Sequence, residues 1–237
     1  MSSKNNIKVA GVSMVGFSFA ELVTNPINVA RVVYQTNDYT LKQTISNIYT
    51  RKAYFKGLQV ALLTKTISLS LKYTLYDFIK NYRGTERDDL FGNMVNGMVS
   101  GVIGTTVTNP LMVWRTRLQR GDSMHLKYSY NGYLVSVARC IPLYSLLFPC
   151  YDFYKSKLGD SVMSGVAAAV MTTITNAIFT HPFDYIRTRR ASSVEFKYTL
   201  NPIKYYRGVH IALARNMPHF VISMLIVDLL NRYFGLH

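Results

Sequence analysis

Cationic side chains interrupt the long apolar segments of this chain of 237 residues. The cations are Lys65, Lys72, Arg139 and Arg215, and a single acid, Glu21, joins them. A charge in the middle of a membrane costs at least ~2.5 kcal/mol, so such residues usually mark the pathway of a polar solute. Arginine binds phosphate and carboxylate through paired hydrogen bonds. Four cations against one acid therefore predict a site for an anionic solute.

Each of these charges also has a structural alternative. Arg139 or Arg215 can be an internally paired structural residue, and Lys65 and Lys72 can extend their amines to the membrane interface. Glu21 can neutralise one of the cations instead of contacting the solute. These alternatives stay open at the level of sequence.

The sequence contains no pattern typical of catalysis or metal binding. Its five histidines are not paired at ligand spacing, and no phosphate-binding loop, nucleophile elbow or dinucleotide fingerprint is found. Cys140 and Cys150 lie ten residues apart on one predicted helix. That is ~15 Å at helical rise, too far for a disulfide. We therefore expect no enzyme and no bound cofactor or metal.

The composition favours a basic membrane protein. Hydrophobic residues make up 49% of the chain and charged residues 16%, with 27 Lys and Arg against 12 Asp and Glu. A soluble domain usually carries about 25% charged residues. Nucleic-acid binding is the weaker explanation of the net charge of +15, because the basic residues are spread through apolar segments and not gathered on one helix.

Six apolar segments are long enough, at roughly 20 residues, to cross a bilayer as helices. They are Val9–Val33, Val60–Ile79, Gly92–Val113, Leu134–Tyr154, Val162–Ile186 and Val209–Leu230. The polar stretch 40–56 predicts a short surface helix. The eight residues before the first segment are too few for a transit peptide, so no removable presequence is expected. We predict an all-α membrane protein forming one domain.

One phrase recurs at the ends of the first, third and fifth segments. In each copy a threonine stands two residues before a proline and an arginine five residues after it. The prolines are Pro26, Pro110 and Pro182, and the arginines are Arg31, Arg115 and Arg187. A fixed period of this kind predicts a repeat architecture. We therefore expect three pseudo-symmetric repeats, at about 8–83, 90–158 and 160–235, with helix kinks at the prolines.

A second phrase recurs at the ends of the even segments. It combines an acid with a residue three positions later on the same helix face. The residues are Asp77 and Lys80, Asp152 and Lys155, and Asp228 and Asn231. Recurrence in three helices favours a ring of contacts between neighbouring helices over isolated surface pairs.

Together these phrases resemble the motifs of the mitochondrial carrier family, and the resemblance covers essentially the whole chain. A third family feature, an aromatic residue followed by a base and glycine, is met at 55–57 and 206–208 and more weakly at 130–132. The resemblance implies six tilted helices around a central cavity, short surface helices on the matrix side, and alternate opening across the mitochondrial inner membrane. It also implies cardiolipin binding at Lys56, Gly57, Gly132, Arg207 and Gly208.

The resemblance further implies a gate at each end of the cavity. The matrix gate comprises Arg31, Arg115, Asp184 and Arg187, braced by Gln35 and Gln119. The acid that the family places two residues after the proline is replaced by Asn28 and Met112 in two repeats. We expect Asp184 to pair with Arg31, leaving Arg115 and Arg187 without partners. The cytoplasmic gate comprises the six residues of the second phrase. The matrix gate is thus expected to be weaker, so that the empty protein favours the matrix-open form.

Family members contact substrate thirteen residues before the acid of each even helix. Here that level holds Thr64 with Lys65, Arg139 with Cys140, and Arg215 with Asn216, while Glu21 and Lys72 lie at depths that the family points into the cavity. The compact loops and altered gate motifs are similar to a carrier encoded by a large DNA virus. This likeness favours nucleotides or deoxynucleotides as substrates of a monomeric antiporter in the mitochondrial inner membrane, that of the host cell if a virus encodes the chain.

Three other functions stay open. The first is exchange of di- or tricarboxylates, and the second is a proton or anion leak in which Glu21 relays protons. The third is a membrane scaffold without transport activity, which the altered gates would favour.

Overall fold

The computed structural model describes residues 3–84, 89–123, 125–159, 162–193 and 200–234. Within them the long helices are α1 (Ser3–Thr36), α3 (Leu58–Arg83), α4 (Leu90–Arg120), α5 (Tyr133–Leu158), α6 (Val162–Ala191) and α7 (Val209–Tyr233). The short elements are α2 (Leu41–Thr50) and the 3-10 helices η1 (Leu126–Tyr128) and η2 (Pro202–Tyr206). Each predicted apolar segment lies inside a long helix, and the predicted surface helix is α2. The all-helical class is confirmed for these residues, which contain no strand.

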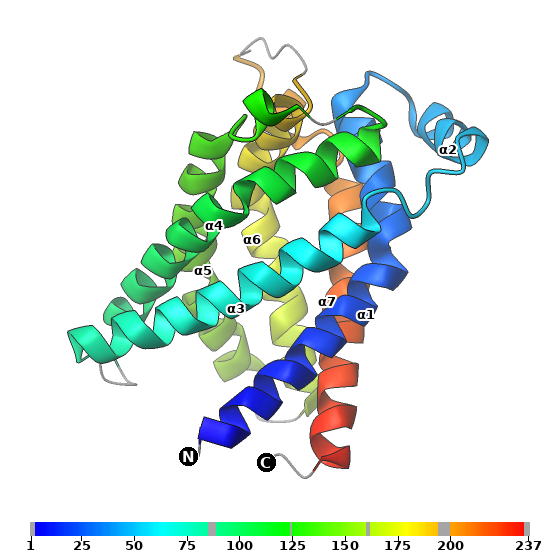
Figure 1. Cartoon of the computed structure of the whole chain (residues 1–237). Helices are drawn as coiled ribbons and strands as arrows, with labels where there is room; N and C mark the ends of the chain where they lie inside the picture. The colour runs from blue at the N-terminus through cyan, green and yellow to red at the C-terminus, as the bar shows by residue number, and fades with distance from the viewer. Residues whose placement is uncertain (1–2, 85–88, 124, 160–161, 194–199, 235–237) are drawn as a thin grey trace.

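The long helices form an inclined bundle in which α1 packs on α7, α3 on α4 and α5 on α6 (Figure 1). Both chain termini lie at one end, and α2 lies at the other. The repeated prolines Pro26, Pro110 and Pro182 lie within α1, α4 and α6. Smaller contacts join α1, α4 and α6 to one another. These are the first, third and fifth long helices, called the odd helices below, and they converge, whereas α3, α5 and α7 are the even helices.

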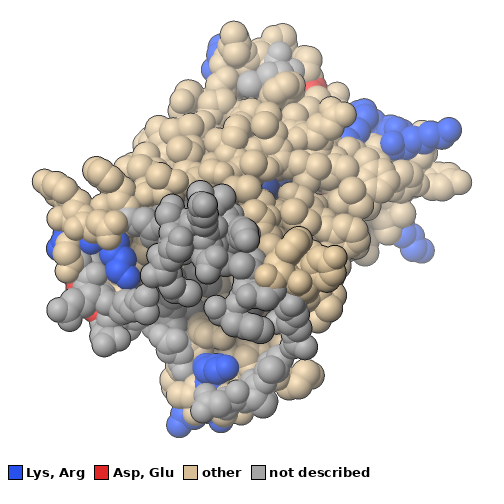
Figure 2. All heavy atoms as spheres, turned by 60° about the horizontal axis from the view of Figure 1, so that its bottom comes forward, with Lys and Arg blue, Asp and Glu red and all other residues tan. Residues whose placement is uncertain are grey.

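Polar groups are buried and apolar groups exposed over much of the bundle. Among the described residues, buried side chains are more often polar than apolar, and large hydrophobic side chains such as Phe19, Val107 and Phe179 are about half exposed. On the face shown in Figure 2 uncharged residues dominate, and Lys and Arg gather in separate groups near the margins. A membrane satisfies such a surface, because lipid solvates the apolar exterior while the polar groups find partners inside.

By length and mean hydropathy, two described stretches can cross a membrane, Met163–Ala191 and Pro202–Val227. The prediction of six spans therefore stays a prediction for the other four long helices. Their hydropathy is lowered by buried polar side chains, as α1 illustrates with Glu21, Asn25 and Asn28, all nearly inaccessible to solvent.

Three glycines precede long helices and bring the start of each against another long helix. Gly57, Gly132 and Gly208 stand directly before α3, α5 and α7 with φ of 72°, 76° and 83°. A Cβ on Gly57 would lie 3.2 Å from the backbone oxygen of Arg115 in α4, and one on Gly208 would lie 3.2 Å from Gln35 in α1. On Gly132 it would lie 3.2 Å from the Arg187 oxygen in α6. These glycines therefore permit close packing of each even helix start on an odd helix.

Gly132→Ala is expected to destabilise the protein more than Gly84→Ala. Both glycines have positive φ, which costs a residue with a Cβ about 1–2 kcal/mol. A Cβ added at Gly84 would meet no atom within 4 Å, whereas the neighbour of Gly132 is backbone that must shift. We expect Gly132→Ala to lose about 1 kcal/mol more, measured as thermal unfolding in detergent. Equal losses would show that this contact does not hold the start of α5 against α6.

Candidate functional site

A cavity of about 230 Å³ lies inside the bundle and receives residues from all six long helices. Its cationic lining residues are Arg31, Lys65, Arg115, Arg139, Arg187 and Arg215, and its acidic lining residue is Asp184. Thr64 and Asn216 also line it. Lys65, Arg139 and Arg215, which the sequence predicts at one level, therefore all belong to the wall of the same cavity.

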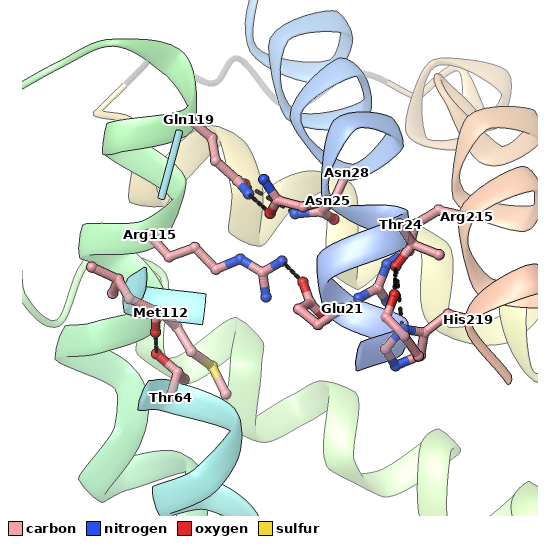
Figure 3. A network of polar contacts seen from close by, with 12 residues as sticks. Glu21, Thr24, Asn25, Asn28, Thr64, Met112, Arg115, Gln119, Arg215 and His219 are labelled. Atoms are coloured by element: carbon pink, nitrogen blue, oxygen red, sulfur yellow. Dashed lines mark hydrogen bonds and ion pairs between the residues drawn. The ribbon is translucent and has the colours of Figure 1, made fainter. Parts of the chain in front are cut away.

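Glu21 stands behind this wall as a buried carboxylate shared by two arginines. Its side chain is inaccessible to solvent, and its two oxygens pair with Arg115 from α4 and, at 2.6 Å, with Arg215 from α7 (Figure 3). Glu21 thus neutralises cavity cations, one of the alternatives left open by the sequence. The expectation that Arg115 lacks a partner is wrong. Glu21 lies five residues before Pro26, so it supplies from another helical turn the carboxylate missing at Asn28.

Asp184 pairs with a different arginine from the one predicted. Its Oδ1 lies 2.9 Å from Nε of Arg139 on α5. Arg31 also lines the cavity but, among the described residues, forms no ion pair within 4.0 Å, and its buried Nε has no hydrogen-bond partner. Arg187 directs Nη1 to the sulfur of Met112 at 3.5 Å. Both predicted substrate arginines, Arg139 and Arg215, are thus held by an acid on an adjacent helix, α6 or α1.

Amide contacts near the repeated prolines join α1 to α4 and to the segment before α7. The Asn28 amide on α1 donates to Gln119 Oε1 on α4 at 3.0 Å, and Gln119 donates to Asn25 Oδ1 at 3.4 Å. Gln35 donates to the Arg207 carbonyl at 3.4 Å. The expected preference of the empty protein for the matrix-open form stays a prediction. Neutral amides and Glu21 take the place of the absent carboxylates, which counting acids in the motif could not reveal.

The residue before each repeated proline ties its helix to the following loop. Asn25 donates to the Tyr54 carbonyl at 3.1 Å, and Asn109 donates to the Ser129 carbonyl at 2.8 Å. His181 Nε2 lies 3.2 Å from the Arg207 carbonyl. The same position thus makes the same kind of contact in each third of the chain.

The remaining predicted residues are placed less centrally or lie outside the described residues. Cys140 is buried and its sulfur faces Thr105 of α4 at 3.8 Å, away from the cavity lining. The side chain of Lys72 lies outside the described residues. The side chains of Asp77, Asp152, Asp228 and Asn231 also lie outside the described residues. Lys80 and Lys155, the bases of the same predicted gate, are described. The cytoplasmic gate stays a prediction.

The guanidinium of Arg207 binds backbone carbonyls at the end of α1 and just beyond it. Its guanidinium donates to the carbonyls of Tyr34, Asn37 and Tyr39 at 3.1, 3.1 and 2.8 Å and stacks over the Tyr34 ring. Lys56, the base of the corresponding phrase in the first repeat, is exposed. The predicted lipid residues therefore differ in how available they are to a phosphate group.

His219 was not singled out in the sequence. It lies four residues after Arg215 and so on the same face of α7, where it is buried and contacts Thr24 of α1 at 3.2 Å. That spacing from a predicted substrate residue was the signal that could have identified it.

Known proteins resemble this chain over nearly its full length, although no family model matches it. A mitochondrial carrier-like protein of Acanthamoeba polyphaga mimivirus is 30% identical, covering 93% of this chain and 94% of that protein. The mitochondrial dicarboxylate carrier of Caenorhabditis elegans is 20% identical, covering 93% and 92%. The mitochondrial aspartate-glutamate transporter of Saccharomyces cerevisiae is 26% identical, covering 58% and 19%. The predicted resemblance is confirmed, and with it the likeness to a protein of a large DNA virus. This chain belongs to the mitochondrial carrier family, whose members named above include transporters.

Proposed function

We propose that this protein exchanges anionic metabolites across the mitochondrial inner membrane by alternating access. The observation that carries the proposal is the charge around the cavity. Among the described residues, six cationic side chains line it, and two carboxylates, Asp184 at the wall and Glu21 behind it, oppose them. Excess buried positive charge is unfavourable unless an anion compensates it. A bound anion would therefore be stabilised there, and the membrane could be crossed without exposing its charge to lipid.

The two proposed gates would let the cavity open to one side of the membrane at a time. Six spanning helices in three repeats would enclose the cavity, with Arg31, Arg115, Asp184 and Arg187 forming the gate at the proline end. Gln35 and Gln119 would brace this gate. Closure here would leave the cavity reachable from the opposite end, where the cytoplasmic gate is proposed. We place this exchange in a monomer whose bilayer contacts include cardiolipin.

Nucleotides or deoxynucleotides are the substrates that we favour. Several arginines at one level suit a group with multiple charges, because each guanidinium can bind phosphate through two hydrogen bonds. Exchange of dicarboxylates is the second candidate, favoured by the likeness to the dicarboxylate carrier over nearly the full chain. A carboxylate substrate would use the same cations, so the two candidates differ in the size of the solute and not in the sign of its charge.

Uptake into liposomes tests the proposal and distinguishes the substrates. Protein reconstituted with internal ATP, dATP, malate or citrate is expected to accumulate the matching labelled anion. Arg139→Gln and Arg215→Gln are each expected to lower uptake about 10–100-fold, because a charged hydrogen bond contributes about 1.5–3 kcal/mol. Lys42→Gln, at an exposed position on α2, should change uptake little. Unchanged uptake in both folded arginine variants would contradict the proposed site, and no uptake of any probe by the unsubstituted protein would favour a scaffold.

A further inference from the structure

Two guanidinium groups of the cavity wall, those of Arg31 and Arg187, have no carboxylate partner among the described residues. Arg31 forms no ion pair with these residues, and its buried Nε has no hydrogen-bond partner among them. Nη1 of Arg187 donates to the sulfur of Met112 at 3.5 Å, and a thioether sulfur is a weak, uncharged acceptor. A buried cation without an opposite charge is costly, so both groups favour an anion beside them.

The two carboxylates at the cavity are already paired with other arginines. Both oxygens of Glu21 are used, one by Arg115 and the other by Arg215. Oδ1 of Asp184 lies 2.9 Å from Nε of Arg139. Neither acid therefore neutralises the two remaining guanidinium groups by direct contact.

Asp184 stands among three guanidinium groups and can balance the charge of one. Its charge acts on Arg139, Arg187 and Arg31, and of the described opposite charges it acts most strongly on the last two. Two positive charges thus remain uncompensated beside it. Arg31 belongs to α1 and Arg187 to α6, so an anion held by both would join two helices that share only smaller contacts.

We propose that Arg31 and Arg187 form a binding site for one small inorganic oxyanion, with phosphate as the expected occupant, separate from the substrate contacts at Arg139 and Arg215. Guanidinium groups bind oxyanions through paired, charged hydrogen bonds, which a thioether cannot provide. The bound oxyanion would hold α1 against α6 at the proline end of the cavity. The inference goes beyond the proposed function, because this anion binds without being transported.

The side chain at position 112 offers a direct test of the site. Met112 stands two residues after Pro110, as Asp184 stands two residues after Pro182. An aspartate oxygen is as many bonds from Cα as the methionine sulfur, so Met112→Asp would place a carboxylate oxygen near the atom that now contacts Arg187. This tethered carboxylate should replace the free oxyanion. Met112→Asn is the matched control, because it has the same shape without the charge.

Thermal unfolding of the full chain in detergent provides the measurement, in sodium gluconate or sodium phosphate of equal ionic strength and without nucleotide. Phosphate at a hundred times its Kd is expected to raise the midpoint by about 5–10 °C in the unsubstituted protein and in Met112→Asn. Met112→Asp should have a higher midpoint in gluconate and respond little to phosphate. Because phosphate also stabilises proteins non-specifically, each shift is compared with that of Arg187→Gln, which should lose the specific part.

Arg215→Gln serves as the control for the substrate contacts and is expected to keep the phosphate shift. Equal shifts in the unsubstituted protein, Arg187→Gln and Met112→Asp would show non-specific stabilisation only and overturn the inference. A shift lost in Arg215→Gln but kept in Arg187→Gln would also overturn it, because phosphate would then bind at the substrate contacts. If Arg187→Gln does not fold, Arg31→Gln replaces it with the same readout.

Uptake of ATP into liposomes distinguishes free phosphate from a phosphoryl group of the substrate. With a separate site, the KM for ATP is expected to stay unchanged or to fall when external phosphate replaces gluconate. A KM that rises in proportion to phosphate would assign Arg31 and Arg187 to the substrate and overturn a separate site. Absence of uptake of every probe would overturn the proposed function, whereas the unfolding measurement, which needs no transport, would still decide this inference.

Discussion

Glu21→Gln is expected to destabilise the folded protein by about 3–5 kcal/mol, the range seen when one partner of a buried ion pair is removed. The glutamine keeps the shape of the side chain and removes its charge. Arg115 and Arg215 would then share a neutral oxygen and would lie close together without the carboxylate that separates them. Because Glu21 is inaccessible to solvent, water cannot replace the lost charge.

Asp38→Asn is the matched control for this substitution. Asp38 also pairs with an arginine, Arg189, but at 3.6 Å and with 81% of its side chain exposed. Exposed pairs of this kind contribute less than about 1 kcal/mol. The unfolding midpoint of each purified variant in detergent gives the comparison. If Glu21→Gln has the same unfolding midpoint as the unsubstituted protein, the shared carboxylate is not what holds α1, α4 and α7 together.

The helices and their order could be predicted because local chemistry determines them. Long apolar runs indicated the six long helices, and the polar stretch after α1 begins with Thr40 and Gln43, whose side chains and backbones bond reciprocally at the start of α2. The shared cavity of Thr64, Arg139 and Arg215 was also predicted from the repeated spacing, because equal spacing places equivalent residues at similar depths in related helices, and Lys65 is the neighbour of Thr64.

The partners of these charges could not be predicted by the same method. The motif assigns an acid to a fixed position after each proline, and Asn28 and Met112 leave two such positions uncharged. Glu21 compensates from outside the motif, and its two partners come from helices about 94 and 194 residues away in the chain. Contacts over such distances depend on how the helices pack, which a motif does not encode. The partners predicted for Arg115 and Asp184 were wrong for this reason.

The contacts of Arg207 could not be predicted either, because they too depend on how the helices pack. Its place in the aromatic-base-glycine phrase indicated a lipid contact by resemblance, but the phrase does not show that the end of α1 lies beside it. The last carbonyls of a helix have no partner within the helix and carry partial negative charge. Arg207 binds three carbonyls there or just beyond, those of Tyr34, Asn37 and Tyr39.

Arg207→Gln is therefore expected to destabilise the protein by about 2–4 kcal/mol. Hydrogen bonds to a charged group contribute about 1.5–3 kcal/mol each, and partial exposure of this guanidinium keeps the total below the sum of three. The loss should be present in lipid-free detergent, because the carbonyls belong to the protein. Lys56→Gln is the control, since Lys56 stands at the corresponding exposed position of the first repeat and should change stability by less than about 0.5 kcal/mol.

Added cardiolipin distinguishes two roles of Arg207, binding of the carbonyls at the end of α1 and binding of a lipid phosphate. If Arg207 acts on the end of α1, its replacement lowers the unfolding midpoint without lipid and leaves the shift caused by cardiolipin largely intact. The reverse result, a normal midpoint and a lost cardiolipin shift, would assign Arg207 to phosphate binding. Comparable caps argue for the first outcome. Arg51 donates to the Arg120 carbonyl at the end of α4 at 3.0 Å, and Arg120 donates to the Ser192 carbonyl beyond α6 at 2.9 Å. At or just beyond the ends of α1, α4 and α6, an arginine from elsewhere in the chain thus binds the free carbonyls.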